Sequence, residues 1–156
     1  MQQSQRTSSQ SNPEAKYFRE YKPTEKAREH IEEIVRKGNV RLLNTFAQEL
    51  GQIFINKMGK EKELTTSQVR SILDDIQSID TSSEDSVRRE LELLRPKLAY
   101  AAGRHKGRVK QFQGVIDYAI ELVTDPNTKA PASMFENLKA FIEAVVAYHR
   151  YYGGRE

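Results

Sequence analysis

Apolar residues in this chain recur at spacings of three and four, and no segment alternates apolar and polar residues long enough to predict a strand. The helix expected over residues 39–57 carries such a stripe at Leu43, Phe46, Leu50, Ile53 and Phe54. A helix with one apolar face needs a neighbour to cover it, and several such helices can cover one another. The pattern therefore predicts an all-α fold.

Capping and stop signals divide the chain into helices. We expect helices to begin near Thr24, Asn39, Thr65, Ser82 or Ser83, Arg108 and Pro131. Pro96 lies inside the fourth helix, and because proline removes a backbone donor, this helix should kink or restart near Arg95. The sixth helix has the widest apolar stripe, which is typical of a central helix packed on two sides. The predicted architecture is a compact bundle of five to six helices.

The chain of 156 residues suits one compact domain. Residues 1–12 are rich in glutamine and serine and bury too little to offset the entropy of ordering. An aromatic segment with Tyr17, Phe18 and Tyr21 follows, and it docks either on the body or on a partner. We expect a flexible N-terminal tail over residues 1–23, a single helical domain over 24–152 and a C-terminal tail over 153–156.

The composition excludes several classes of protein. No cysteine occurs, which excludes disulfides, thiolate zinc sites and cysteine nucleophiles. The N-terminus lacks the apolar core of a signal peptide, and no apolar run reaches the roughly 20 residues that span a bilayer. We therefore expect a soluble, cytoplasmic protein that does not contact a membrane.

Residues that often carry catalysis show no catalytic pattern. His30, His105 and His149 are far apart in sequence, and none belongs to a recognisable metal-ligand motif. Asp74 and Asp75 are adjacent, so on a helix they point about 100° apart and do not bind one metal ion unaided. No glycine-rich phosphate loop and no GxSxG motif occurs. We expect no enzyme activity, no cofactor and no metal.

Positive charge is concentrated in residues 95–116, although the formal net charge of the whole chain is only +3. This stretch has no Asp or Glu, and its basic residues are Arg95, Lys97, Arg104, Lys106, Arg108 and Lys110. Gly103 and Gly107 bracket a turn, where a positive φ or a close backbone approach has no Cβ penalty.

This basic stretch predicts contact with a nucleic-acid backbone. The planar fork of arginine donates to two phosphate oxygens at once, and Tyr100 is placed to stack on a base or ribose. The alternative from the residues alone is a solvated basic surface with Tyr100 in the core.

Three blocks of the sequence resemble the small subunit of the type III-A CRISPR interference complex, the Csm complex. They are LTTSQVRSIL at 64–73, LRPKLAYAAGR at 94–104 and FENLKAFIEAVVAYHRYY at 135–152, and the resemblance covers about residues 40–152. It implies a small, all-helical, non-catalytic protein that stacks head to tail along a filament of RNA-binding subunits. The implied partners are guide RNA and target RNA, contacted through their backbones, other copies of the chain, and the backbone and large subunits of the complex.

Carried over block by block, the resemblance predicts RNA contacts by Arg70, Arg95, Lys97, Tyr100 and Arg104. Charge alone adds four further residues, Arg108, Lys110, Lys57 and Lys60. The acidic stretch 74–92 beside the basic one suits head-to-tail stacking, which needs two complementary patches. Two other interpretations stay open: a helical protein-interaction module without a nucleic-acid role, and a metal-dependent hydrolase that uses acidic residues.

Overall fold

The computed structural model describes residues 13–156, and this part of the chain forms seven helices and one small hairpin. The elements in order are α2 (Pro13–Tyr17), β1 (Phe18–Arg19), β2 (Lys22–Pro23), α3 (Glu25–Val35), α4 (Val40–Phe54), α5 (Thr66–Gln77), α6 (Glu84–His105), α7 (Gly107–Thr124) and α8 (Pro131–Tyr151). The predicted all-α bundle is confirmed, and its six predicted helices correspond to α3 through α8.

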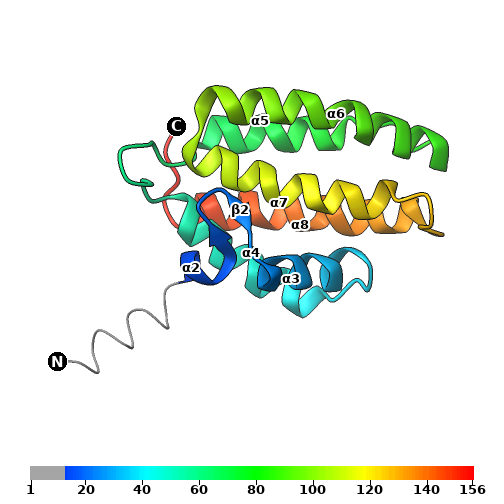
Figure 1. The fold of residues 1–156 in the computed structure, drawn as a ribbon, viewed down its shortest axis with the longest axis horizontal. Helices are drawn as coiled ribbons and strands as arrows, with labels where there is room; N and C mark the ends of the chain where they lie inside the picture. Colours follow the sequence, from blue (N-terminus) through cyan, green and yellow to red (C-terminus); the bar gives the residue numbers. More distant parts are fainter. Residues whose placement is uncertain (1–12) are drawn as a thin grey trace.

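The long helices stack in three layers of two (Figure 1). The helices α5 and α6 form one outer layer, α3 and α4 form the other, and α7 and α8 lie between them. Helix α8 packs on α4 on one side and on α5 on the other, so its wide apolar stripe is covered by two neighbours, as predicted. The helices α4 and α8 run in the same direction, whereas α6 and α7 are antiparallel and joined by a tight corner (Figure 1).

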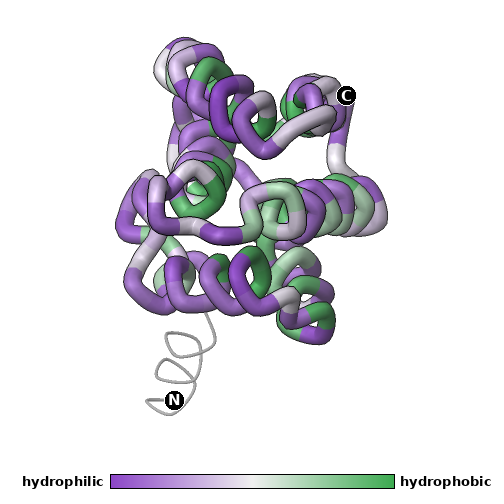
Figure 2. The backbone as a smooth tube through the Cα atoms, turned by 90° about the vertical axis from the view of Figure 1, so that its right-hand side faces the viewer, coloured by the Kyte–Doolittle hydropathy of each residue, from purple (hydrophilic) through white to green (hydrophobic). Residues whose placement is uncertain are grey.

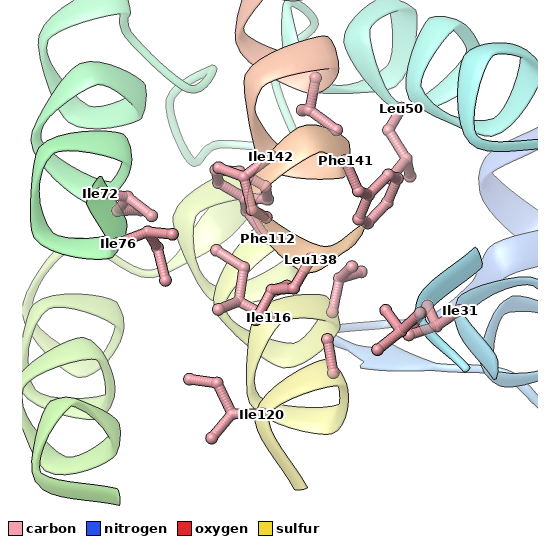
Figure 3. Close-up of a cluster of buried hydrophobic side chains, with 14 of the residues drawn as sticks. Ile31, Leu50, Ile72, Ile76, Phe112, Ile116, Ile120, Leu138, Phe141 and Ile142 are labelled. Atoms are coloured by element: carbon pink, nitrogen blue, oxygen red, sulfur yellow. The ribbon is translucent and has the colours of Figure 1, made fainter. Parts of the chain in front are cut away.

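The apolar stripes meet in one continuous core. Viewed along the helices, hydrophobic segments of the backbone face the interior and hydrophilic segments face the solvent (Figure 2). Side chains from five helices point toward one another, among them Ile31, Leu50, Ile76, Ile116 and Phe141 (Figure 3). Burial of a side chain of this size stabilises the fold by roughly 1.5–3 kcal/mol. The matched stripes therefore hold the three layers together.

Side chains cap the starts of four of the described helices, as the sequence predicts, and Asn39 caps α4. The Thr24 hydroxyl accepts a hydrogen bond from the Ala27 amide at 3.3 Å. Thr65 and Gln68 form a complete capping box at the start of α5, and Ser83 caps α6. Each cap satisfies a backbone donor that has no partner within its helix, which stabilises the fold by about 1 kcal/mol.

The middle of α6 differs from the prediction. The helix is continuous from Glu84 to His105, so the restart expected near Arg95 is wrong. Pro96 is exposed, and on that side water can satisfy the carbonyl that loses its partner, while the buried leucines opposite hold the helix in place. Gly103 also lies inside α6 without a positive φ, so it does not bracket the turn.

Residues 13–23 fold against the body of the protein. Tyr17 is 1% exposed and Phe18 is 5% exposed. The Tyr17 ring packs edge-on against Phe46 with the ring centres 4.8 Å apart, and the Phe18 ring lies 6.0 Å from that of Phe54. From residue 13 onward, a docked segment therefore replaces the flexible tail expected over residues 1–23, because its aromatic side chains find apolar partners on α4. Residues 1–12 lie outside the described residues.

The predicted C-terminal tail is also attached to the body. The Thr66 hydroxyl donates to the Gly154 carbonyl at 3.1 Å, and a guanidinium nitrogen of Arg155 lies 3.8 Å from a carboxylate oxygen of Glu63. A Cβ on Gly154 would overlap the ring of His149, so only glycine allows this approach. The tail thereby connects the end of α8 to the start of α5.

Gly51 tests the contact between α4 and α8. A Cβ on Gly51 would lie 2.8 Å from Tyr148 Cβ and 2.9 Å from the His149 backbone nitrogen. Because backbone atoms of a packed helix cannot move aside, Gly51→Ala should lower the free energy of unfolding by about 1–3 kcal/mol. Gly103→Ala is the control, since its Cβ meets open space and alanine favours a helix by about 1 kcal/mol over glycine. Urea unfolding followed by circular dichroism measures both variants; a Gly51→Ala variant as stable as the control would contradict the close packing.

Candidate nucleic-acid interface

Two residues with left-handed backbone conformations form the corner between α6 and α7. The φ angle is 55° at Lys106 and 60° at Gly107. Gly107 also approaches the loop of residues 55–65, where a Cβ on it would lie 3.0 Å from Glu61 Cβ and 3.2 Å from the Lys62 carbonyl oxygen. Both facts favour glycine at this position, and the close approach places the corner beside the loop.

Arg108 connects this corner to the loop from inside the protein. Its side chain is 4% exposed, and Nη1 lies 2.7 Å from Glu14 Oε2. Nε donates to the Asn56 carbonyl at 2.9 Å and Nη2 donates to the Lys57 carbonyl at 3.1 Å. Nη1 also donates to Gln111 Oε1 at 2.9 Å. The protein itself satisfies this guanidinium, so Arg108 is not on the surface predicted to contact RNA and instead positions the loop.

Two further residues of the basic stretch pair with acidic side chains of neighbouring helices. Arg95 donates from Nε to Asp117 at 2.8 Å and from Nη2 to Glu121 at 2.9 Å, both on α7. The hydrogen bond to Asp117 raises the pKa of Arg95 above its usual value. Lys97 Nζ donates to Asp75 on α5 at 2.9 Å. These pairs connect α6 to both neighbours, and little uncompensated charge remains on Arg95 and Lys97.

Lys110 contacts the hairpin. Its Nζ lies 4.7 Å from the centre of the Tyr21 ring, at a distance typical of a cation–π interaction. The Tyr21 hydroxyl in turn donates to Glu61 Oε1 at 2.7 Å. Lys110 is half-buried and connects the first half of α7 to the hairpin.

The remaining cations at this corner form one exposed surface, which we call the basic pole. It consists of Lys57, Lys60 and Lys62 from the loop and Arg104 and Lys106 from the corner. Within residues 13–156, none of these side chains forms an ion pair. The basic pole lies at the end of the bundle where α6 ends and α7 begins (Figure 1).

The sequence identifies this surface only in part. Lys57, Lys60 and Arg104 are among the predicted contacts, whereas Lys62 and Lys106 are not. The run of lysine and glutamate at residues 60–63 is balanced in charge, which hides its lysines as a positive surface. In the structure Glu61 accepts from Tyr21 and Glu63 lies near Arg155, and in the described part of the chain neither carboxylate forms an ion pair with Lys60 or Lys62.

Two predicted contacts lie on the outer layer formed by α5 and α6. Tyr100 is 73% exposed on α6, one turn before Arg104, so the alternative that its ring belongs to the core is wrong. Arg70 is exposed in the first half of α5. Helix α5 begins at the same end of the bundle as the basic pole (Figure 1). Both residues are therefore exposed in the halves of their helices that lie nearer the basic pole.

The histidines have different surroundings. His149 is buried, and its Nε2 donates to the Leu64 carbonyl at 2.6 Å. The His30 ring lies 5.4 Å from the Tyr17 ring, and burial lowers the pKa of both His30 and His149. His105 is exposed at the end of α6. Among the residues described, no group of three or more His, Cys, Asp or Glu side chains could hold a metal ion, and no helix is long and apolar enough to cross a membrane.

Comparison with known proteins identifies the family. A family model described as Csm2 Type III-A matches residues 37–155, well over half of the chain. The chain belongs to the Csm2 type III-A family. The protein named CRISPR system Cms protein Csm2, from Enterococcus italicus, is 34% identical over 99 residues. That alignment covers 57% of this chain and 68% of the relative. No solved structure matches the chain.

Membership of the Csm2 family confirms the resemblance carried by the three sequence blocks and makes the chain a small subunit of a type III-A CRISPR complex. All residues of the basic pole lie within the matched region 37–155. Helix α2, the hairpin and α3 precede it. The part of the chain that matches Csm2 therefore contains the basic pole but not the docked N-terminal segment.

Replacement of Arg108 tests its role in positioning the loop. In Arg108→Ala, the carbonyls of Asn56 and Lys57 and the carboxylate of Glu14 lose a buried partner. We expect the free energy of unfolding to fall by about 3 kcal/mol or more. Arg104→Ala, which removes an exposed arginine in the last turn of α6, should change it by less than about 0.5 kcal/mol. Urea unfolding at neutral pH measures both, and equal stability of the two variants would contradict the role of Arg108.

The same pair predicts a dependence on pH. The hydrogen bond from Arg108 lowers the pKa of Glu14 below its ordinary value of 4.5. A carboxylate with a lowered pKa stabilises the folded state above the ordinary value, and this stabilisation is lost as pH falls through the lowered one. Glu14→Gln should therefore lose less stability than the wild type between neutral and acidic pH. Thermal unfolding measured from neutral to acidic pH checks this. If the wild type and Glu14→Gln lose the same stability, the Glu14–Arg108 pair does not contribute to the pH dependence.

Proposed function

We propose that this chain is a non-catalytic, RNA-binding small subunit of a type III-A CRISPR effector complex in the cytoplasm. Copies of it stack along the filament beside the backbone and large subunits, and contact guide RNA and target RNA through their backbones. The observation that carries the RNA contact is the basic pole. Two segments of the chain meet there, and the cations that they expose have no acidic partner in the part of the chain that is described.

The chemistry of the basic pole suits phosphates better than base edges. All its members except Arg104 are lysines, which act as point charges on flexible stems. Contacts of this kind fix the position of a strand and carry no sequence information. A subunit that follows a guide of arbitrary sequence needs such contacts. The exposed ring of Tyr100 adds a stacking surface that accepts any base.

The loop that carries three of the lysines is held at both ends. Arg108 binds the carbonyls of Asn56 and Lys57 at its start, and buried His149 donates to the Leu64 carbonyl at its end. A loop already in its bound conformation loses less entropy when a ligand binds. The structure therefore supports a loop whose lysines are preorganised for RNA.

One observation favours a second candidate, a helical protein-interaction module without a nucleic-acid role. Acidic residues Asp80, Glu84 and Asp85 are exposed where α5 ends and α6 begins, at the opposite end of the bundle from the basic pole (Figure 1). A contact between the two ends of successive copies would be electrostatically complementary. In this alternative the basic pole meets an acidic protein surface, such as that of another copy.

Alanine at three positions of the basic pole tests the proposed function. The variant Lys57→Ala, Lys60→Ala, Lys62→Ala should bind unrelated single-stranded RNAs more weakly and to the same extent for each sequence. The slope of log affinity against log salt concentration should fall by about 0.7 for each phosphate that the variant no longer neutralises. Fluorescence anisotropy over a salt series, with assembly partners present, measures this slope.

A variant that removes the same charge at the other end of the bundle is the control for this experiment. Arg41, Arg89 and Lys129 are exposed there and serve this purpose when replaced by alanine. An unchanged salt slope in the basic-pole variant would refute the RNA contact. Loss of self-association in that variant, with RNA binding intact, would favour the protein-interaction module.

Two substitutions of Lys106 distinguish the effect of its backbone strain on stability from the effect of its charge on RNA binding. Its φ of 55° and ψ of −164° lie in a region that favours glycine, at a cost of about 1–3 kcal/mol for another residue. Lys106→Gly should therefore raise the free energy of unfolding by about 1 kcal/mol while weakening RNA binding. Lys106→Ala keeps the strain and should weaken binding equally without stabilising the fold. Chemical unfolding and anisotropy together measure both effects, and wild-type binding by Lys106→Gly would exclude Lys106 from the interface.

A further inference from the structure

The N-terminal hairpin brings together cations outside the basic pole. Strands β1 and β2 pair antiparallel, with Arg19 directly opposite Lys22. Like charges in opposed positions repel each other and destabilise a hairpin. From residue 13 to the C-terminus, no side chain forms an ion pair with either of them. The described part of the chain therefore leaves this repulsion uncompensated.

Arg28, in the first turn of α3, adds a third cation. Its Nη1 donates to the Pro23 carbonyl at 3.0 Å, which holds the guanidinium beside the hairpin. Arg19, Lys22 and Arg28 line a cleft of about 330 Å³ together with Pro23, Thr24 and Glu25. Glu25 is the one acid in this lining, so the charge around the cleft is positive.

The backbone that carries these cations is fixed by contacts with the body. Gln111 Nε2 donates to the Glu20 carbonyl at 2.8 Å, and the Tyr21 hydroxyl donates to Glu61. A Cβ on Gly114 would lie 3.2 Å from the Tyr21 carbonyl oxygen, so the hairpin lies directly on α7. Glu20 itself has a φ of 58°, a conformation that persists because these contacts hold the turn. The cleft is therefore already formed before any ligand enters.

The hairpin adjoins the basic pole. Glu61, which accepts the hydrogen bond from Tyr21, lies between Lys60 and Lys62 in the loop. Lys110 covers the Tyr21 ring and brings a further positive charge to the hairpin. A strand that crosses the basic pole therefore has the hairpin beside it.

We propose that Arg19, Lys22 and Arg28 form a second phosphate-binding site, which takes a phosphodiester group of the RNA strand that the basic pole binds. Two arginine forks and one ammonium group supply enough donors for both non-bridging oxygens of a phosphodiester, and their positive charge attracts it. A phosphate between Arg19 and Lys22 also relieves their repulsion. The inference rests on the proposed function and extends it to a segment that precedes the region matching the Csm2 family.

A variant with Arg19→Ala and Lys22→Ala in the full chain tests this site. Arg28 is retained because it also bonds to the Pro23 carbonyl. Because the variant neutralises one phosphate fewer, the salt slope of single-stranded RNA binding should fall by about 0.7, with about tenfold weaker binding at low salt. The control Arg41→Ala with Lys129→Ala removes two exposed cations at the other end of the bundle and should keep the wild-type slope. Thermal unfolding should show no loss of stability in the hairpin variant, since it removes a repulsive pair.

The outcomes separate this site from the basic pole. Suppose that the hairpin variant keeps the wild-type salt slope and the variant of Lys57, Lys60 and Lys62 has a smaller one. The second site is then overturned and the proposed function stands. If neither variant changes the slope, both are overturned. A reduced slope in both variants, with the control unchanged, supports both sites.

A second measurement distinguishes an RNA strand from a free anion. Inorganic phosphate and a short single-stranded RNA are each titrated into the full chain, and the backbone amide signals of the hairpin are followed by NMR. We expect RNA to shift these signals at concentrations at least about tenfold below those that inorganic phosphate requires, because several linked phosphates bind at once. If RNA and inorganic phosphate shift these signals at equal concentrations, the hairpin is a site for free phosphate and the contact with an RNA strand is overturned.

Discussion

One buried guanidinium connects three parts of the chain that are far apart in sequence. Arg108 on α7 binds Glu14 of the N-terminal segment and two carbonyls of the loop that follows α4. A charge removed from water is tolerated only when nearly all of its donors find partners, and the loss of one partner is costly. The N-terminal segment, the loop and α7 must therefore assemble together. The basic pole and the hairpin both take their positions from this assembly.

The acidic residues determine which cations remain available. Asp117 and Glu121 pair with Arg95, Asp75 pairs with Lys97, and Glu14 pairs with Arg108. Within residues 13–156, the five cations of the basic pole and the two of the hairpin, Arg19 and Lys22, have no such partner. A chain whose formal net charge is only +3 thus presents a strongly positive surface. Local charge, rather than net charge, determines attraction for a polyanion.

Local signals made much of the fold predictable. Helix starts depend on caps such as Thr65, and helix faces depend on the spacing of apolar residues, so all six long helices could be located. The site was less predictable because a stretch of positive residues on two helices points in several directions. Arg95 and Lys97 face neighbours, Arg104 faces solvent and Arg108 faces the interior. These differences depend on packing partners distant in sequence, which spacing does not reveal.

The separation in sequence between contacting helices also affects how the protein folds during translation. Helix α8 covers both α4 and α5, yet it is the last of the described helices to leave the ribosome. Until it emerges, the apolar faces of these two helices lack their cover. Exposed surface of this kind makes a nascent chain prone to aggregation and a substrate for chaperones. Translation that stalls before Pro131 would consequently yield a fragment unable to close its core, however stable the finished protein is.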